Sequence, residues 1–481
     1  MNRRRRIGFM ALSPFLFAMV LGGCASLDAR PAFHEVQRGV ADRTGELVQW
    51  STGSDEDAAV AAKVRAMLAD ELTLDETVQV ALLNNRRLQG VYEQLGVAQA
   101  NLVQAGLLKN PIFDAELKFL DNVSGTKAVL EMAVIQDFMD IAMIPLRKRL
   151  AEAQLEATKA EVTAAVLDLA SEVKVAFVSL QAAEQTLAMR KQILQSTDAS
   201  YDAAIRLHEA GNITDLSLAN ERALYEQSKL AVASAETAVL EARERMNTLM
   251  GLWGDDTRWH VADGLPPVPD EEMDLTDLER RAVAANLGLT MLRDEMRVVA
   301  SRTGIDAAEL VFPELAGGAA AEYEGPEDKW LVGPAIAIAI PIFDWGQART
   351  AAGRHRLRGL WNEYTALAIE VRSAARAAKY RLRNARQQSE YYRRVVLPLA
   401  EQITAETQLQ YNAMQLGVFQ LLQAKQREID TRRMYIIAQR DYWIARTELE
   451  QILAGRMLRG TAVDVSADAG GGMDMGGNGG H

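Results

Sequence analysis

The stretch that decides the fold is VTAAVLDLASEVKVAFVSLQAAEQTL, residues 162–187. Apolar or small side chains recur in it at gaps of 4, 3, 4, 3, 4, 3 and 4 residues, which is the spacing of a coiled-coil seam. The seam consists of Val162, Val166, Leu169, Val173, Ala176, Leu180, Ala183 and Leu187. The pattern predicts a helix from Pro145 to Leu207 that stops at Gly211. Such a helix is ~90 Å long and needs partners of similar length, because one small core cannot cover it.

The second half of the chain contains another seam, with gaps of 4, 3, 4, 3 and 4 residues, on a helix that runs to Gly417. Its members are Leu360, Tyr364, Leu367, Val371, Ala374 and Ala378. We expect this second rod to pack side by side with the first. A protein with two such rods is built to span a distance.

The N-terminal residues have the pattern of a bacterial lipoprotein signal. Residues 3–6 are all arginine, residues 7–21 are apolar, and Leu-Gly-Gly leads to Cys24. Cys24 is the only cysteine, so we expect it to be the acylated first residue of the mature chain, released to the outer membrane. The alternative is an ordinary cleaved signal with a chance cysteine. The composition of residues 25–70 predicts a polar, weakly structured arm with one short helix near residues 60–68.

The composition excludes some classes of function. The net charge of −12 argues against a nucleic-acid surface. No second apolar run is long enough for a membrane helix, so any other membrane contact has to be made by strands.

The body of the chain begins with a helix that Thr73 can cap and that is predicted to run to about Leu108. A strand pair follows, because apolar side chains at 113, 115, 117 and 119 alternate with charged ones, and residues 128–136 return after a turn. The second half repeats this order at offsets near 200 to 206 residues, so the chain is an internal duplication of helix, strand, strand, long helix and helix.

The expected organisation is mainly α with a small β part. Its segments are a signal peptide (1–23), an acylated arm (24–71), repeat 1 (72–263; strands about 111–138, tip about 207–216), a Pro-rich linker (264–274), repeat 2 (275–455; strands about 313–343, tip about 412–422) and a flexible Gly/Met/His tail (456–481).

The strands favour an oligomer in a membrane. In residues 335–340, Ile and Ala alternate, as they also could in a soluble sheet. Two strand pairs in lipid would leave unpaired backbone edges, so other copies of the chain would have to complete the sheet. Basic residues at 147–149 and at 349, 354, 356 and 358 begin the rods. They contact anionic head groups or form a solvated helix face; the sequence leaves both open.

Together these motifs resemble the TolC, or outer membrane factor, family, especially acylated members such as OprM and CusC. The resemblance rests on Cys24, on LTLDETVQVALLNN (72–85), GLLKNP (106–111), EAGNITDL (209–216) and PIFDWG (341–346), and covers about residues 72–455. It implies a homotrimer with a 12-stranded β-barrel in the outer membrane and a 12-helix periplasmic tunnel. It also implies two partners, a periplasmic membrane-fusion adaptor and an inner-membrane transporter.

The implied function is a passive exit duct of a tripartite efflux system, with no cofactor and no enzymatic activity. The chain shows no nucleotide loop, no Ser/His/Asp spacing and no paired His with metal-ligand spacing. One alternative is a coiled-coil lipoprotein that tethers the envelope without a pore, although a tether has no use for alternating strands. Another is a duct for organic compounds or secreted protein.

By resemblance, the glycine turns form the tip where the tunnel narrows and the adaptor docks. We expect Gly211 and Gly417 to take the left-handed conformation that ends a long helix. The docking residues inferred are Leu207, Gly211, Asn212, Thr214, Leu416, Gly417 and Val418. Gln423 and Gln426 stand where relatives carry the acidic groups of a cation-binding constriction, so we predict a neutral closed tip.

The glycine-rich tail gives one hint about the substrate. It carries Met473, Met475 and His481, and soft thioethers with an imidazole suit Cu(I) or Ag(I). The alternative is a disordered end in which these residues are incidental. Together with the resemblance to CusC, the tail favours heavy-metal efflux, with copper as the ion.

Overall fold

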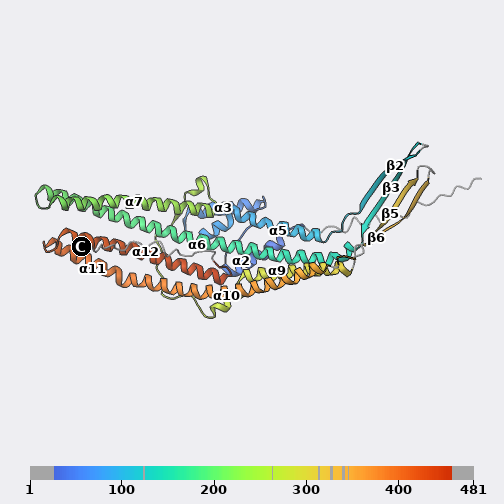
Figure 1. Cartoon of the computed structure of the whole chain (residues 1–481). Coiled ribbons are helices and arrows are strands. Elements are labelled where there is room, and N and C mark those ends of the chain that lie inside the picture. Colours follow the sequence, from blue (N-terminus) through green and yellow to red (C-terminus); the bar gives the residue numbers. More distant parts are fainter. Residues whose placement is uncertain are drawn as a thin grey trace, which may run out of the picture.

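The protein is an elongated array of helices with a small sheet at one end (Figure 1). The computed structural model describes residues 27–122, 125–262, 264–311, 315–324, 329–338, 342–344 and 346–457. Repeat 1 contains α4 (Leu74–Asn84), α5 (Arg86–Ala105), β2 (Ile112–Asn122), β3 (Gly125–Asp137), α6 (Met139–Glu209) and α7 (Asp215–Met250). Repeat 2 contains α8 (Leu278–Ala285), α9 (Leu287–Val311), β5 (Leu315–Glu324), β6 (Lys329–Ile338), α10 (Gln347–Tyr391), η2 (Tyr392–Val396), α11 (Leu397–Asn412) and α12 (Val418–Ala454).

The first rod, α6, is 71 residues long and therefore about 105 Å. The helix was predicted to start at Pro145. It begins instead at Met139, directly after β3, so Pro145 lies inside it. In the second turn, a missing N–H removes only one early helical hydrogen bond, which a rod of this length tolerates.

The second rod is not one continuous α-helix. A π-helical turn, η2, separates α10 from α11, and Pro398 lies in the first turn of α11. Proline cannot donate the helical hydrogen bond and crowds the preceding turn, so the wider π turn accommodates it.

The seams predicted that the two rods pack against each other, and this prediction is wrong. Near the sheet the helices follow one another in the order α5, α6, α9, α10; toward the far end the order is α7, α6, α12, α11 (Figure 1). Each repeat thus contributes two neighbouring helices to a single layer, and α9 and α12 separate α6 from α10. The seam of α6 is buried instead against α4, α5 and the N-terminal helices, with Val162, Val166, Val173 and Leu180 fully buried.

The predicted helix from Thr73 to Leu108 breaks at Asn85. The capping box at its start is present: Thr73 Oγ1 accepts from the Glu76 N–H at 3.3 Å and Glu76 accepts from the Thr73 N–H at 2.9 Å. Asn85 has extended backbone and its side chain accepts the Leu88 N–H at 3.0 Å, which starts a new helix. Asn286 does the same for α9 in repeat 2, where it accepts the Leu289 N–H at 2.9 Å.

A left-handed glycine ends the last helix of each repeat. Gly251 ends α7 with φ 68° and Gly455 ends α12 with φ 105°. A Cβ on Gly251 would lie 2.8 Å from the carbonyl oxygen of Asn84, and Gly455 lies against the carbonyl of Ala285 in the same way. Both positions therefore require glycine, because the chain end packs on the end of α4 or α8.

The N-terminal arm is ordered, which corrects the expectation of a weakly structured segment. It forms α2 (Arg30–Thr44) and α3 (Asp55–Ala69), followed by β1 (Glu71–Leu72), which pairs in parallel with β4 (His260–Val261). Phe33 packs edge-on against Tyr92 of α5 at 5.0 Å between ring centroids. Arg43 Nη1 donates to the carbonyls of Ala285 at 2.8 Å and Ala454 at 2.7 Å. The arm thus joins the two repeats, because Phe33 packs on α5 of repeat 1 and Arg43 caps the ends of α8 and α12 of repeat 2.

The linker between the repeats crosses the helices as an extended strap. Gln181 of α6 donates to the Ala262 carbonyl at 3.1 Å, Trp443 of α12 to the Pro266 carbonyl at 2.9 Å, and Arg386 of α10 to the Pro269 carbonyl at 2.8 Å. These side chains satisfy carbonyls that a proline-rich segment cannot pair within itself.

Candidate functional site

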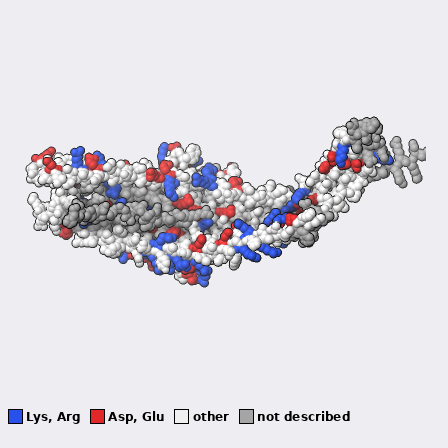
Figure 2. Space-filling view, in the orientation of Figure 1, with Lys and Arg blue, Asp and Glu red and all other residues white. Residues whose placement is uncertain are grey.

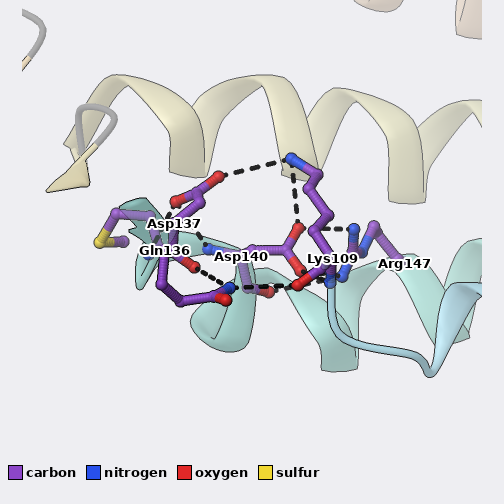
Figure 3. Close-up of polar contacts among 6 residues, drawn as sticks. Lys109, Gln136, Asp137, Asp140 and Arg147 are labelled. Carbon is purple, nitrogen blue, oxygen red and sulfur yellow. Dashed lines mark hydrogen bonds and ion pairs between the residues drawn. The ribbon is translucent and has the colours of Figure 1, made fainter. Parts of the chain in front are cut away.

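A polar cluster holds the sheet onto the first rod (Figure 3). Asp140 lies in the first turn of α6 with its side chain 2% exposed. It accepts from Arg147 Nη1 at 2.7 Å and Nη2 at 3.0 Å, and from the Lys109 N–H at 3.2 Å. Lys109 Nζ also lies 3.3 Å from Asp140 and 3.4 Å from Asp137. The cluster connects the end of α5, the end of β3 and the start of α6, and so fixes the angle of the sheet.

The charge of Asp140 is kept by its partners. Burial by itself would raise the pKa of Asp140, but the hydrogen bonds from Arg147 and from Lys109 outweigh it and hold the pKa below its usual value. The same contacts with Asp140 raise the pKa of Lys109. Repeat 2 has a simpler counterpart, in which Asp344 accepts the Gly346 N–H at 2.7 Å and lies 3.5 Å from Arg349.

The sheet has one apolar and one charged face. Its strands are antiparallel in the order β2-β3-β5-β6. Register places Leu117, Leu130, Tyr323 and Trp330 in one row, and the neighbouring rows on this face are also free of charge. The other face carries Glu116, Glu131 and Glu322 in one row, with Lys118 bound to Glu131 at 2.7 Å. The apolar faces of the two strand pairs coincide, so the sheet offers one continuous apolar surface.

The first hairpin tip connects α6 to α7 with a five-residue turn, residues 210–214. Gly211 is left-handed, with φ 73°, and the Asn212 N–H bonds the Leu207 carbonyl at 2.8 Å, as in a Schellman motif. Thr214 caps α7 by accepting the Ser217 N–H at 3.2 Å. The predicted tip residues Leu207, Gly211, Asn212 and Thr214 therefore lie together.

The second tip corrects the expectation for Gly417. Its turn, residues 413–417, is as long as the first, but the left-handed residue is Met414, with φ 58°. The Gln415 N–H bonds the Gln410 carbonyl at 2.9 Å. Gly417 has φ −80° and is the N-cap of α12, the place that Thr214 takes in repeat 1. Equal turn length, and not the position of the glycines, aligns the two tips.

Two exposed residues of the second tip, Met414 and Phe419, were not found from the sequence. Met414 is 95% exposed in a conformation that costs a non-glycine residue free energy, and Phe419 is also exposed. His208 Nε2 lies 2.7 Å from Asp215 Oδ1 across the first tip. Leu416, Gly417 and Val418 lie at the second tip, whereas Gln423 and Gln426 follow on α12, both exposed. Both tips lie at the end of the molecule opposite the sheet (Figure 1).

Two expected sites lie outside the described residues: Cys24, and the tail with Met473, Met475 and His481. Within the described part of the chain, no group of three or more His, Cys, Asp or Glu side chains could hold a metal ion. Among the same residues, no helix is both long and apolar enough to be a candidate membrane span.

Residues 77–252 match the family model of outer membrane efflux proteins. Over these residues the chain is similar to the outer membrane efflux protein family. The match runs from within α4 to just past the end of α7, and includes the junction around Asp140 and the first tip. The resemblance noted from the sequence motifs is thereby confirmed. Comparison of the sequence with curated proteins gives no match.

Solved structures share the fold of this chain over most of its length. A membrane protein from Pseudomonas aeruginosa has a TM-score of 0.68 at 16% identity, over 79% of this chain and 93% of the other. CusC, described as forming a transmembrane channel, has a TM-score of 0.68 at 16% identity, over 80% of this chain and 93% of the other. The open-state outer membrane channel MtrE of Neisseria gonorrhoeae has a TM-score of 0.66 at 16% identity, over 79% of this chain and 89% of the other. The mainly helical fold with a small sheet is thus the fold of these channels.

The layer of helices is open, and both of its edges expose apolar side chains. On α7, the positions that alternate by 3 and 4 residues from Leu216 to Leu240 are all exposed, which is the spacing of an unfilled coiled-coil seam. Except for Glu226 and Thr237, these positions are small or apolar: Leu216, Ala219, Ala223, Leu230, Ala233 and Leu240. At the opposite edge, exposed apolar side chains form a stripe along α10, η2 and α11. They are Trp361, Ile369, Tyr380, Tyr391, Val395, Leu399 and Ile403.

Proposed function

We propose that this protein is the exit duct of a tripartite efflux system, assembled as a homotrimer. One observation carries the proposal: a single chain is open at both edges, in its sheet and in its helical layer alike. β2 and β6 are the edge strands of the sheet, and each has a neighbouring strand on one side only. In lipid each unpaired backbone group costs several kcal/mol, so β6 of one copy has to meet β2 of the next. Three copies of a four-stranded sheet make a 12-stranded barrel, a size found among membrane barrels.

The helical layer closes in the same sense as the sheet. Following the order of the helices, α10 of one copy faces α5 of the next, and α11 faces α7. This brings the apolar side chains of α10 near the sheet against α5, and those of α11 against the exposed seam of α7. Burying a Leu or Phe-sized side chain stabilises by roughly 1.5–3 kcal/mol, so the two edges together supply a strong drive for association.

The proposed lumen follows from the two faces of the sheet. The apolar face, with Phe113, Leu117, Val332 and Ile336, suits lipid, and the charged face with Glu131 suits a water-filled interior. The helical tunnel would continue this interior to the tips, so substrate would pass without any chemical step.

The test is planar-bilayer conductance of the purified oligomer. We expect channels from the wild-type trimer. A double variant of the α7 seam, Leu230→Glu with Leu240→Glu, should lose the trimer and the channels. The matched control, Gln227→Glu with Ser234→Glu, adds the same charge at exposed polar positions of α7 and should keep both. A wild-type oligomer without channels would instead identify the chain as a non-pore tether.

The arm supports a lipid anchor at Cys24. Helix α2 begins at Arg30, six residues after Cys24, and a tether of that length spans at most about 20 Å. Glu35 of α2 pairs with Lys159, which is 20 residues into α6 and so about 30 Å from the sheet; Arg30 lies about one and a half turns closer. At full extension the tether therefore covers most of the distance to the sheet, which supports an anchor at Cys24. Labelling with a radioactive fatty acid, with Cys24→Ser as control, tests acylation.

The tips are the proposed docking site for the periplasmic adaptor that connects to an inner-membrane transporter. They carry exposed backbone turns and lie at the free end of the rods. Residues 407–424 of the second tip contain no charged side chain, so a closed tip would be held by packing and by neutral amides such as Gln423 and Gln426. We expect Leu207→Glu with Leu416→Glu to abolish efflux in cells while the purified trimer still conducts. Wild-type efflux from this variant would refute docking at these tips.

Copper is the proposed cargo, supported by the tail residues Met473, Met475 and His481. Deleting residues 470–481 should leave the trimer intact and weaken Cu(I) binding, measured by competition with a chromogenic chelator. Equal Cu(I) affinity of the truncated and full-length proteins would remove the support for copper and leave organic compounds or secreted protein as the cargo.

A further inference from the structure

The helices next to the sheet form a basic zone, here called the neck: residues 94–110, 139–151, 291–311 and 347–362. The neck contains eleven Lys or Arg and five Asp or Glu, in a chain whose net charge is −12. Figure 2 shows Lys and Arg gathered on the helices at this end. Three of the five acids, Asp140, Asp294 and Asp306, are buried and pair with Arg147, Arg297 and Arg302, so the excess positive charge of the neck lies on its other basic side chains.

Two arginines of the neck stand at the open edge of the layer. Arg354 and Arg358 are exposed and have no ion pair or hydrogen bond within the described residues. They are four residues apart, and Trp361 follows three residues later, so all three share one face of α10. Arg356 lies on another face and pairs with Glu295 of α9 at 2.7 Å. The face with Arg354 and Arg358 is therefore continuous with the apolar stripe that meets the next protomer.

The facing edge offers these arginines no carboxylate. In the proposed trimer, the opposite edge at this level is the end of α5, and residues 94–110 contain no Asp or Glu. Their one charged group, Lys109, is a cation already engaged by Asp137 and Asp140. A positive edge would therefore meet an edge with no free carboxylate, and the charge of the two arginines would stay unbalanced unless an anion binds between the protomers.

The level of the two arginines fits the surface of the membrane. They are 7 and 11 residues into α10, about 10 and 17 Å from its start below the sheet. The polar layer of a bilayer extends roughly 5–8 Å beyond its hydrocarbon core, and an extended arginine side chain bridges much of the remaining distance. The guanidinium fork binds phosphate oxygens in a bidentate manner.

We propose that Arg354 and Arg358 bind the phosphate of an anionic phospholipid at the neck, in the seam between two protomers. This inference rests on the proposed function, because it requires both the membrane sheet and the trimer. The lipid phosphate would balance the charge of the two arginines in the seam, where the facing edge supplies no free carboxylate.

The test compares lipids retained by trimers purified from nanodiscs that contain phosphatidylglycerol and phosphatidylcholine, by native mass spectrometry. Wild-type trimers should retain phosphatidylglycerol, up to one per seam. Arg354→Gln with Arg358→Gln should weaken retention about tenfold to thirtyfold, from the loss of two basic side chains at the surface. The control, Arg372→Gln with Arg383→Gln, removes two exposed, unpaired arginines farther along α10 and should retain lipid as the wild type does. Added inorganic phosphate should not displace the lipid.

Conductance of the same preparations separates this inference from the proposed function. Both double variants should still assemble and conduct. If wild-type and neck-variant trimers conduct and retain phosphatidylglycerol equally, the lipid site is refuted and the duct stands. Displacement of the lipid by inorganic phosphate would also refute it, in favour of a site for free anions. If the wild type forms no trimer, the proposed function fails and the lipid site with it.

Discussion

Alanine at Gly251 should destabilise the protein more than any exposed substitution. A Cβ there would lie 2.8 Å from the Asn84 carbonyl oxygen and 3.3 Å from Asn85 Cα, both of them main-chain atoms that cannot rotate away. Relief would move the end of α7 off the end of α4. That movement would strain three hydrogen bonds: from Asn84 Nδ2 to the carbonyls of Met250 at 3.0 Å and Gly251 at 2.9 Å, and from Asn85 Nδ2 to Leu249 at 2.8 Å.

The magnitude combines three effects. A left-handed alanine costs about 1–2 kcal/mol. Weakening three hydrogen bonds costs about 0.5–1.5 kcal/mol each if they are lost fully. The lower chain entropy of alanine in the unfolded state returns about 0.4–1 kcal/mol. We therefore expect Gly251→Ala to reduce the free energy of unfolding by about 2–4 kcal/mol, and Gly455→Ala to behave alike because its Cβ would meet the Ala285 carbonyl.

The assay is thermal unfolding of the purified protein together with hydrogen exchange at the Leu252 N–H, which bonds the Asn247 carbonyl at 2.9 Å. Both should show loss of stability in Gly251→Ala. The control is Gly39→Ala, inside α2, where a Cβ meets nothing within 4 Å and alanine should stabilise by about 0.5–1 kcal/mol. If the melting temperature of Gly251→Ala equals or exceeds that of Gly39→Ala, the ends of α7 and α4 do not pack as closely as described.

Three further predictions concern the tips and the junction. Met414→Gly should slow hydrogen exchange at the second tip severalfold by relieving left-handed strain, and Gly211→Ala should speed it at the first tip; unchanged rates in both would contradict the assignment of the turns. Gly417→Ser should change the free energy of unfolding by less than about 0.5 kcal/mol, because serine is a favoured residue at a helix N-cap. A large loss of stability would argue that Gly417 is not the N-cap of α12. Arg147→Met should lower the free energy of unfolding by about 2–3 kcal/mol, because it leaves Asp140 buried with fewer partners. Since the folded pKa of Asp140 is depressed, the stability that ionised Asp140 contributes in the wild type should be present above pH ~4 and be lost as the pH falls through the folded pKa. If the variant had the same dependence of melting temperature on pH as the wild type, this prediction would be refuted.

The sequence alone determined the features that depend on neighbours along the chain. The heptad seam at 162–187 specified a long helix, Thr73 and Glu76 specified its capping box, and alternation from Phe113 to Phe119 specified a two-faced strand. Each of these signals comes from side chains within one or two turns of one another, so no knowledge of the tertiary structure is needed to interpret them. The motifs also led to the family, although the match covers repeat 1 and not the whole chain.

Tertiary structure decided which surfaces meet. A heptad seam shows that a helix has a partner but not which one, and here α9 and α12 take the places between the rods that the seams suggested they would share. The arm at residues 30–69 has weak periodicity and becomes ordered because Phe33 packs against Tyr92 of α5 and Arg43 binds carbonyls 242 and 411 residues away. At the second tip, a turn as long as the first places the left-handed residue at Met414, the second residue of its turn as Gly211 is of the other, while Gly417 takes the N-cap of α12.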